Sequence, residues 1–393
     1  MTAIDRRIAA DLARLAHAGL TRRPPAIHER RGVRYRLEDR NVIGLCSNDY
    51  LGLADEIHAS SPRAGAGASR LVNGDLDEHR DVERVLAELV GTEDAVLFPS
   101  GYQLNVGVLP ALVRHDDIAC SDALNHASLI DGLRLGRANV DVLAHREAPD
   151  ARPMPGGDAI LWWITESIFS MDGDLADLDA MRRHLARDAA LYVDEAHALG
   201  LYDGGRGRLA QHGITPTAIV GTLGKAYGVA GAFVGATAAA CEWIRSRARS
   251  FVFSTGTSPA VIAPIVAAIE RVRGSDGDSR RARLWHAARH LAHRLGLDDA
   301  PSPIIPIVIG DNDTTIAVAA ALLERGWHVQ PIRPPTVPAG TSRLRVTLSA
   351  DHEPAMLDAF VDDLRRVLDA ARVPLVVERG LATSPGSSVG GVQ

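Results

Sequence analysis

A single lysine, Lys225, lies among small and apolar residues in the stretch VGTLGKAYGVAG (220–231). The chain has 43 lysines and arginines together, and Lys225 is the only lysine among them. Arginine can replace lysine on most surfaces, but a guanidinium stays charged and cannot act as a free amine. A lysine amine forms Schiff bases with carbonyl compounds, and a dry pocket lowers its pKa toward neutrality. Lys225 is therefore a candidate nucleophile, and survival by chance is the alternative.

A carboxylate that could serve the same chemistry precedes this lysine by about 30 residues. Asp194 ends the apolar run ALYVD (190–194), and His197 follows it in VDEAH. A charged carboxylate at the end of a buried strand needs a cationic partner. Pyridoxal phosphate (PLP) enzymes place such a group against the pyridinium nitrogen, so that the ring becomes an electron sink. His197 could then bind the ring hydroxyl or the substrate. Asp194 taken alone could equally be a helix N-cap.

The same stretches superficially resemble nucleotide-binding motifs. VDEAH looks like the Walker B box of a helicase, and TLGKAY looks like a phosphate loop. A phosphate loop requires the pattern GxxxxGK[ST]. Here Ile219 stands at the first glycine position, and Ala226 replaces the hydroxyl that binds magnesium. We therefore exclude a nucleoside triphosphatase.

An anion site and a ring contact can also be placed. Ser100, Gly101 and Tyr102 occupy an expected strand-to-helix junction, where free N–H groups and the helix dipole attract a phosphate. Thr222 could add a hydroxyl to the same phosphate. His126 begins an expected helix in DALNHASLIDG and could reach the face of the ring. A solitary histidine there is more often a cap or a surface residue.

The elements that must position these residues alternate between short apolar runs and helical patterns from about residue 75 to 250. Runs that are apolar throughout and separated by helices indicate a parallel sheet covered on both faces. The fold class is therefore α/β. Candidate strands are residues 95–98, 117–121, 159–165, 190–194, 218–222 and 231–235.

Other patterns flank this region. The N-terminus repeats apolar residues at helical spacing, a hairpin that turns at Asp39–Arg40 follows it, and two long helices and a compact α+β unit come after the strands. The final residues have the composition of a disordered end. We expect an N-terminal segment over 1–47, a large domain over 48–285, a C-terminal α+β domain over 286–375 and a disordered tail over 376–393.

Composition narrows the class of function. A net charge of −6 without any Lys/Arg-rich block provides no basic face for nucleic acid. No apolar run is long enough to span a membrane, and the N-terminus is neither a signal nor a transit peptide. Cys46, Cys120 and Cys241 are far apart, which argues against disulfides and a zinc site and fits a reducing cytosol. We expect a cytoplasmic protein without a metal.

Seven stretches, in this order, resemble the α-oxoamine synthases, PLP enzymes of fold type I that join an amino acid to an acyl thioester and release CO₂. The resemblance runs from about residue 4 to 371 and implies a mostly parallel seven-stranded sheet, a smaller C-terminal domain and a homodimer with its active site at the interface. IRPPTVPAGTSRLRVTLSADHE (332–353) resembles the branch that condenses L-alanine with a pimeloyl thioester in biotin biosynthesis. The stretches are SNDYLGL (47–53), GAGASRLVNG (65–74), SDALNHASL (121–129), TESIFSMDGD (165–174), VDEAHALG (193–200), GTLGK (221–225) and FSTGTSP (253–259).

The resemblance implies a role for each matching residue. Lys225 bonds the PLP aldehyde and then serves as general base, Asp194 faces the pyridinium nitrogen, and His126 stacks on the ring. The remaining cofactor contacts are His197 and Ser170 near the ring oxygen, Ser100, Gly101, Tyr102 and Thr222 around the phosphate, and Thr255 reaching that phosphate from the other subunit.

Substrate contacts follow from the same resemblance. Asn48 and Arg345 match the positions that hold the amino-acid carboxylate, and the planar fork of arginine suits that task. Arg22 and Arg23 lie where the distal carboxylate of the pimeloyl chain is expected, although they could equally be ordinary solvated charges. Residues 55–64, DEIHASSPRA, are shorter than the helix that the family usually has there.

Other functions stay open. A sister enzyme would use glycine, serine or another acyl-CoA with the same chemistry, and the acyl carrier could be coenzyme A or a carrier protein. A silent subunit should have lost Lys225, and a regulator should carry an N-terminal DNA-binding domain. An aminotransferase is disfavoured by the stretches NHAS and RPPTVPAG.

Overall fold

The computed structural model describes residues 1–21, 24–58 and 60–377. Contacts divide the chain into two compact units, and each is described by itself. The sheet unit comprises Glu56–Ser170 and Asp174–Ser279. The terminal unit comprises Met1–Asp55, Met171–Gly173 and the described chain from Arg280 onward. The domain boundaries expected from the sequence stay predictions, and residues 378–393 of the expected tail lie outside the described residues.

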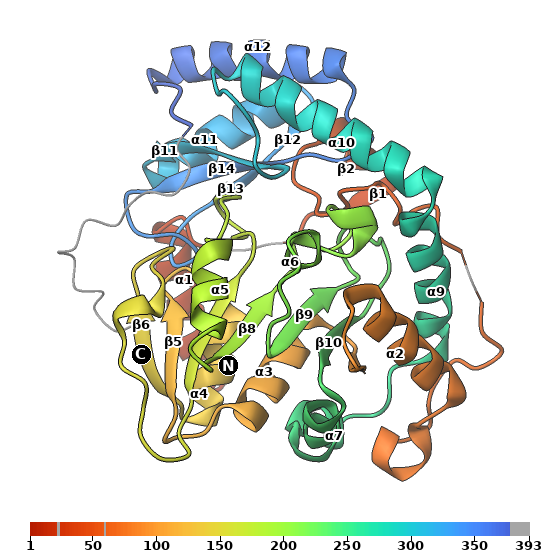
Figure 1. Ribbon diagram of the computed structural model, residues 1–393. Helices are drawn as coiled ribbons and strands as arrows, with labels where there is room; N and C mark the ends of the chain where they lie inside the picture. The colour runs from red at the N-terminus through yellow and green to blue at the C-terminus, as the bar shows by residue number, and fades with distance from the viewer. Residues whose placement is uncertain (22–23, 59, 378–393) are drawn as a thin grey trace. The chain divides into compact units, whose positions relative to one another are not determined.

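The sheet unit is built on seven strands in the order β4-β10-β9-β8-β7-β5-β6 (Figure 1). Neighbours from β9 to β6 pair in parallel, whereas β10 is antiparallel to both β4 and β9. The expected seven-stranded, mostly parallel sheet is thereby confirmed. The strands are β4 (Asp94–Phe98), β5 (Ile118–Asp122), β6 (Asn139–Leu143), β7 (Leu161–Glu166), β8 (Ala190–Asp194), β9 (Ala218–Thr222) and β10 (Ala232–Ala236).

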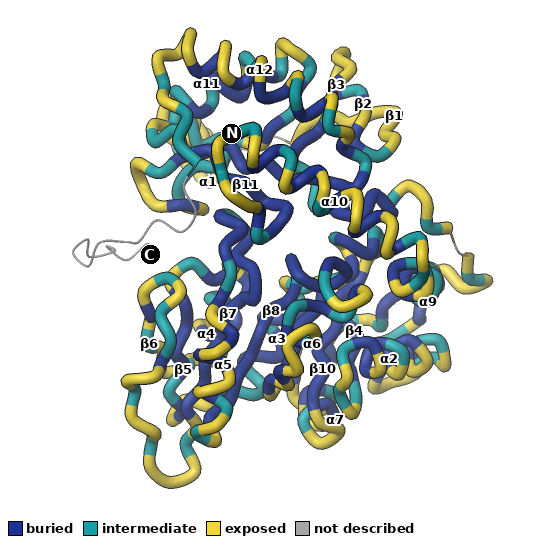
Figure 2. The backbone as a smooth tube through the Cα atoms, turned by 45° about the horizontal axis from the view of Figure 1, so that its top comes forward, coloured by how far each residue is buried: buried dark blue, intermediate teal, exposed yellow. Residues whose placement is uncertain are grey.

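One of these strands, β6, was absent from the expected set. Its sequence NVDVL interrupts two valines with polar residues, and most of the strand is exposed. A strand at the edge of a sheet can keep polar side chains on its surface, so it lacks the continuous apolar run that marks its buried neighbours. In contrast, β7 and β8 are buried over their whole length (Figure 2).

Helices cover both faces of the sheet (Figure 1). Successive residues of a strand point to opposite faces, so Trp162 packs in the apolar cluster that includes α3 and α4, and Trp163 packs in the cluster that includes α5. The helices of this unit are α2 (Asp77–Val90), α3 (Gly101–Leu112), α4 (Ala127–Gly136), α5 (Leu178–Leu185), α6 (Arg208–Gln211), α7 (Ala238–Arg247), α8 (Arg249–Val252) and α9 (Pro259–Arg273), with the π-helix η1 (Arg70–Gly74) and the 3₁₀ turns η2 (Pro149–Ala151) and η3 (Asp203–Gly205).

The terminal unit contains two smaller sheets, ordered β1-β2-β3-β12 and β11-β14-β13. The expected hairpin is present as β2 and β3, which turn at residues 38–39, one position earlier than predicted. The elements of the terminal unit are α1 (Ala3–His17), β1 (Ile27–Arg31), β2 (Arg34–Leu37), β3 (Arg40–Gly44), β11 (Ile304–Gly310), α11 (Asn312–Leu323), β12 (Trp327–His328), β13 (Gln330–Ile332), β14 (Ser342–Thr347) and α12 (Pro354–Ala371), together with α10 (Ser275–Arg294) from Arg280 onward.

The N-terminal helix α1 forms where helical spacing predicted it. Thr2 and Asp5 cap its first turn in both directions, which satisfies backbone N–H groups that a helix start leaves open. None of its residues is buried, and Ile4, Ile8 and Leu12 are all exposed. Across residues 1–21, 24–58 and 60–377, no helix has the length and apolar character needed to cross a membrane.

Candidate active site

The candidate site lies at one edge of the seven-stranded sheet. Because β4, β8 and β9 run in the same direction, their carboxyl ends share this edge. In open α/β sheets, ligands bind outside the carboxyl ends of the strands. β4 leads to Ser100, β8 ends at Asp194, and β9 ends at Thr222 and leads to Lys225. The sheet order therefore gathers residues that are far apart in the sequence.

Lys225 and His197 are in direct contact. The Nζ atom of Lys225 lies 2.8 Å from Nε2 of His197. The loop after β9 is tight, because the Gly228 N–H donates to the Lys225 carbonyl and Gly228 takes a left-handed φ of 68°. Gly200 packs closely against this loop, because a Cβ at its position would stand 2.5 Å from the Cβ of Ala226. The amine is thus held against an imidazole that can share or accept its proton.

Asp194 is held by two N–H groups. Its Oδ1 accepts from the backbone of Ala196 at 2.9 Å, and its Oδ2 accepts from Nδ2 of Asn105 at 3.1 Å. Asn105 is fully buried in α3, and its Oδ1 accepts the hydroxyl hydrogen of Tyr192 at 2.7 Å. Hydrogen bonds to the charged form of a carboxylate favour that form. The sequence did not point to Asn105, although it stands one helical turn after the Gly101 junction.

His126 is the N-cap of α4, as its alternative interpretation expected. Its Nδ1 accepts from the Ser128 backbone at 3.2 Å, and its own N–H donates to Glu166 at 2.6 Å. The residue as a whole is exposed, although its Nδ1 is turned toward the start of the helix. Partial burial among its neighbours lowers the pKa of His126, with Lys225 adding to the effect and Asp194 opposing it. A neutral, open imidazole face at this edge is suited to stacking on an aromatic ring.

Glu166 is a second buried acid that the sequence did not single out. It ends β7, next to β8 in the sheet, and is 2% exposed. Burial raises the pKa of Glu166 to about 8, with the charge of Asp194 adding to this rise and Lys225 opposing it. Two carboxyls so placed cannot both ionise cheaply. The only signal in the sequence was its place at the end of an apolar run.

A buried histidine between two acids fixes the neighbouring loops. His145 lies 3.0 Å from Oδ1 of Asp122 through Nδ1, and 2.8 Å from Oδ2 of Asp174 through Nε2. Burial alone would lower the pKa of His145, but these two hydrogen bonds raise it to about 9. The charged imidazole therefore ties the end of β5 to the segment that follows Ser170.

The start of α3 and the end of β9 form the candidate anion site. Ser100 caps α3 by accepting from Gln103 N at 3.3 Å. A Cβ on Gly101 would stand 4.0 Å from the Cβ of Thr222, so the first turn of α3 lies beside the Thr222 side chain, whose hydroxyl donates to the Gly231 carbonyl at 3.4 Å. The first N–H groups of a helix have no partner within the helix and attract anions. The side chain of Tyr102 is 51% exposed, and its hydroxyl donates to Asp131 at 2.6 Å.

The structure places the other expected residues elsewhere or leaves them undescribed. Ser170 is buried at the end of a sheet-unit segment, and Thr255 is exposed on a segment that pairs with Ser69. In the terminal unit, Nη1 of Arg345 donates to Oδ1 of Asn48 at 3.2 Å. Arg22 and Arg23 lie outside the described residues, and residues 55–58 and 60–64 contain no helix.

The groups of the sheet unit fit PLP. They supply a reactive amine at Lys225, a carboxylate at Asp194 with its hydrogen bonds already made, and a helix start at Gly101 for a phosphate. An imidazole at His126 can lie on a ring. These are the protein groups that PLP chemistry requires around its aldehyde, its pyridine nitrogen and its phosphate.

Known proteins resemble this chain over nearly all of its length. The family described as aminotransferase class I and II matches residues 40–364. The 8-amino-7-oxononanoate synthase of Herminiimonas arsenicoxydans is 41% identical over 92% of this chain and 99% of its own, and that of Anaeromyxobacter dehalogenans strain 2CP-C is 45% identical over 92% and 95%. A solved structure of SPT, serine palmitoyltransferase, with its PLP internal aldimine is 26% identical, covers 95% of this chain and 100% of its own, and has a TM-score of 0.84. The chain therefore belongs to the aminotransferase class I and II family, with PLP as its cofactor, as its α-oxoamine synthase motifs predicted.

Proposed function

We propose that this chain condenses L-alanine with a pimeloyl thioester to give 8-amino-7-oxononanoate, CO₂ and a free thiol in biotin biosynthesis. The observation that carries the chemistry is the contact of the only lysine with His197, at the sheet edge that also holds Asp194. The choice of substrates is supported by relatives of 41% and 45% identity that are named for this product. The cytoplasmic location expected from the sequence stays a prediction.

Each site residue of the sheet unit has a task in the proposed reaction. Lys225 would hold PLP through its aldehyde, and its free amine would be the general base for the Cα proton of the amino acid. His197, at 2.8 Å, orients the amine and can hold its proton. Asp194 would face the pyridine nitrogen of PLP, and Asn105 keeps Asp194 in place through its hydrogen bond. When bound, PLP supplies the electron sink for deprotonation and for loss of CO₂.

The remaining tasks concern binding and orientation. His126 would lie on the face of the ring. The start of α3 would hold the phosphate through its N–H groups, together with the hydroxyl of Thr222. The remaining proposed contacts are Ser100, Gly101 and Tyr102 at the phosphate and Ser170 and His197 at the ring oxygen.

The terminal unit would bind the substrate carboxylates. Arg345 is 6% exposed and already donates one hydrogen bond to Asn48. A guanidinium offers two parallel N–H groups to a carboxylate, so Arg345 suits the carboxylate of alanine. Arg22 and Arg23 keep their proposed role at the far carboxylate of the pimeloyl chain, on the strength of the resemblance alone.

A homodimer is part of this proposal. Apolar residues that are exposed in the single chain support it, since a soluble monomer rarely shows many of them together. Leu71 is 56% exposed, Val72 is 76% exposed and Phe253 is 71% exposed. Phe253 stands two residues before Thr255, the residue proposed to reach the phosphate of the other subunit.

A second candidate is a sister enzyme that uses serine or glycine. The match to SPT, an enzyme with a PLP internal aldimine, favours it, but the identity of 26% is well below that of the 8-amino-7-oxononanoate synthases. Both candidates share the chemistry at Lys225. They differ in the substrates that release thiol.

Thiol release decides between them. PLP-loaded protein is mixed with alanine, glycine or serine and with pimeloyl-CoA or palmitoyl-CoA, and free thiol is measured. We expect release with alanine plus pimeloyl-CoA only. Release with serine plus palmitoyl-CoA instead would contradict the proposal. Lys225→Arg keeps the charge, yet it should lose both the visible absorbance of the loaded protein and all turnover, because a guanidinium forms no imine.

A further inference from the structure

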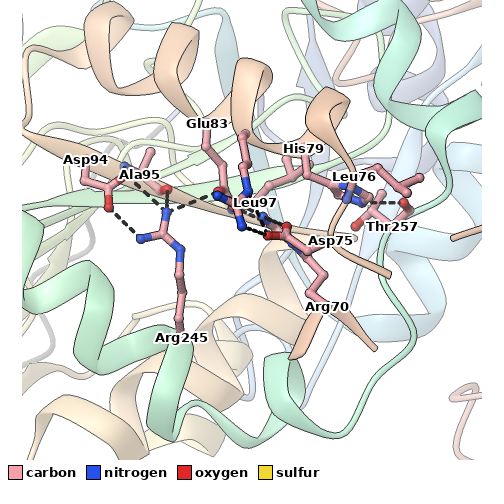
Figure 3. Close-up of polar contacts among 11 residues, drawn as sticks. Arg70, Asp75, Leu76, His79, Glu83, Asp94, Ala95, Leu97, Arg245 and Thr257 are labelled. Carbon is pink, nitrogen blue, oxygen red and sulfur yellow. Dashed lines mark hydrogen bonds and ion pairs between the residues drawn. The ribbon is translucent and has the colours of Figure 1, made fainter. Parts of the chain in front are cut away.

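A buried cluster of charged residues lies outside the candidate active site (Figure 3). Arg70, in the π-helix η1, donates to both oxygens of Glu83 in α2, with Nη2 and Oε2 3.1 Å apart. Its Nε also donates to Asp75 at 2.7 Å. Arg70 is 8% exposed and Glu83 is 3% exposed. The cluster therefore fixes a short helix of irregular geometry by paired charges inside the protein.

Glu83 connects this helix to the strand that leads into the anion site. Its Oε1 accepts from the backbone of Leu97 in β4 at 2.8 Å, and its Oε2 accepts from Arg245 in α7 at 3.1 Å. Arg245 in turn donates to the carbonyl of Ala95 in the same strand at 2.7 Å. Leu97 precedes Ser100 by three residues. One carboxylate thus links η1, α2, β4 and α7 (Figure 3).

His79, one turn before Glu83 on the same face of α2, holds a second segment. The ring is fully buried, and its Nδ1 accepts from the Leu76 backbone at 3.2 Å. The proton of a neutral imidazole must then sit on Nε2. Nε2 lies 2.8 Å from the carbonyl of Thr257 and donates to it. His79 therefore ties α2 to the chain two residues after Thr255.

The segment around Thr255 is held from two sides. On one side Ser69 bridges to Thr255, and the Gly256 N–H donates to Ala68 O at 2.9 Å. On the other side Gln103, in the first turn of α3, donates to Ser254 Oγ at 3.1 Å. The backbone of Thr255 is therefore fixed, while its residue surface stays exposed.

Global stability alone does not account for this arrangement. A buried ion pair contributes little net stability compared with an apolar core of the same volume, and π-helices are frequent at functional sites. Directly after the buried Arg70, the π-helix presents Leu71 and Val72 to the surface. The charges thus hold one backbone conformation of a segment that is itself exposed.

We propose that His79, Arg70 and Glu83 are positioning residues. They hold Thr255 in the conformation in which its hydroxyl binds the PLP phosphate of the other subunit. This inference rests on the proposed role of Thr255 in the cofactor site. It assigns to residues that touch neither substrate nor cofactor the task of setting cofactor affinity.

The test compares PLP dissociation constants of apo-protein variants, measured by absorbance titration without amino acid or thioester. His79→Leu removes the bond to Thr257, whereas His79→Gln keeps a donor at the position of Nε2. We expect His79→Leu to weaken PLP binding by about tenfold, because the Thr255 hydroxyl would lose its hydrogen bond to the charged phosphate. His79→Gln should stay within about threefold of the wild type.

The decisive comparison adds Thr255→Val. This change should weaken PLP binding by about the same factor, and the double variant with His79→Leu should be no weaker than either single variant, because both act through one contact. His184 provides the matched control, since it is also fully buried and its Nε2 lies 2.9 Å from the carbonyl of Ala190. His184→Leu should lower the melting temperature without changing PLP affinity.

Three results would overturn the proposal. The effects of His79→Leu and Thr255→Val could multiply in the double variant, or His79→Leu could lower the melting temperature and leave PLP binding unchanged. A Thr255→Val variant that binds PLP as the wild type would remove the basis of the proposal and leave the reaction proposed above intact. If His79→Leu does not fold, Arg70→Lys, which replaces a paired contact by a single one, is measured against Thr255→Val in the same way.

Discussion

Replacing Asn105 by leucine is expected to destabilise the protein and to weaken PLP binding. Asn105 is fully buried, donates to Asp194 at 3.1 Å and accepts from Tyr192 at 2.7 Å. Leucine has a similar volume but leaves the Tyr192 hydroxyl and one oxygen of Asp194 without this partner. The Ser128 hydroxyl, to which Asn105 also donates at 2.9 Å, keeps its contact with Nδ1 of His126. Each buried group that loses its partner costs about 1–3 kcal/mol. The free energy of unfolding should therefore fall by about 2–6 kcal/mol.

The effect on PLP has a separate origin. Among the described residues, Asp194 keeps the hydrogen bond from the Ala196 N–H, so its carboxylate is held less firmly where the pyridine nitrogen would meet it. A hydrogen bond to a charged group contributes about 1.5–3 kcal/mol. The affinity for PLP should fall by about tenfold to a hundredfold.

Urea unfolding of the apo-protein and PLP titration measure the two effects. Tyr192→Phe serves as the partner variant, because the double variant removes donor and acceptor together. Its loss of stability should be smaller than the summed losses of Asn105→Leu and Tyr192→Phe by more than about 0.5 kcal/mol. Additive losses would refute the proposed contact, and unchanged PLP affinity in Asn105→Leu would refute its link to Asp194.

Two predictions concern pH. Burial lowers the pKa of His352 to about 4, and its hydrogen bonds with the backbone of Gly44 and Ser349 oppose this shift only in part. The unfolded chain binds this proton below about pH 6.5, so stability is lost as the pH falls from about 6.5 to 4, by about 3 kcal/mol in all. Urea unfolding at several pH values should show a shallower loss in His352→Gln, and an identical profile would contradict the assignment. The raised pKa of Glu166, about 8, has the opposite sign: apo-protein stability should fall as the pH rises from about 4.5 to 8. Glu166→Gln keeps an acceptor for the His126 N–H and should flatten that part of the profile, whereas a slope equal to the wild type would exclude Glu166 as its source.

Much of the sheet unit followed from local patterns. Apolar runs predicted six of the seven strands, because strands buried on both faces must be apolar throughout. The edge strand Asn139–Leu143 escaped because it is largely exposed. Lys225 was found from the chemistry that a guanidinium cannot replace.

The partners of the site residues could not be predicted in the same way. Asn105 and Asp194 are 89 positions apart, and Glu166 is 40 positions from the His126 backbone that it accepts from. An acid at the end of an apolar run has the same local pattern whether it binds a ligand or caps a helix. His126 caps α4 while the residue stays exposed, so its capping role does not exclude the ligand contact proposed for it.

The sequence by itself determined which side chains follow which strands and which of them could react with an aldehyde. Only the tertiary structure decided that the Lys225 amine meets the His197 imidazole, and that Glu83 joins the Arg70 helix to β4. The physical reason is that burial patterns are local, whereas these contacts depend on the order of strands in the sheet. That order places β8 beside β9 and inserts the antiparallel β10 between β9 and β4, which the order along the chain does not reveal.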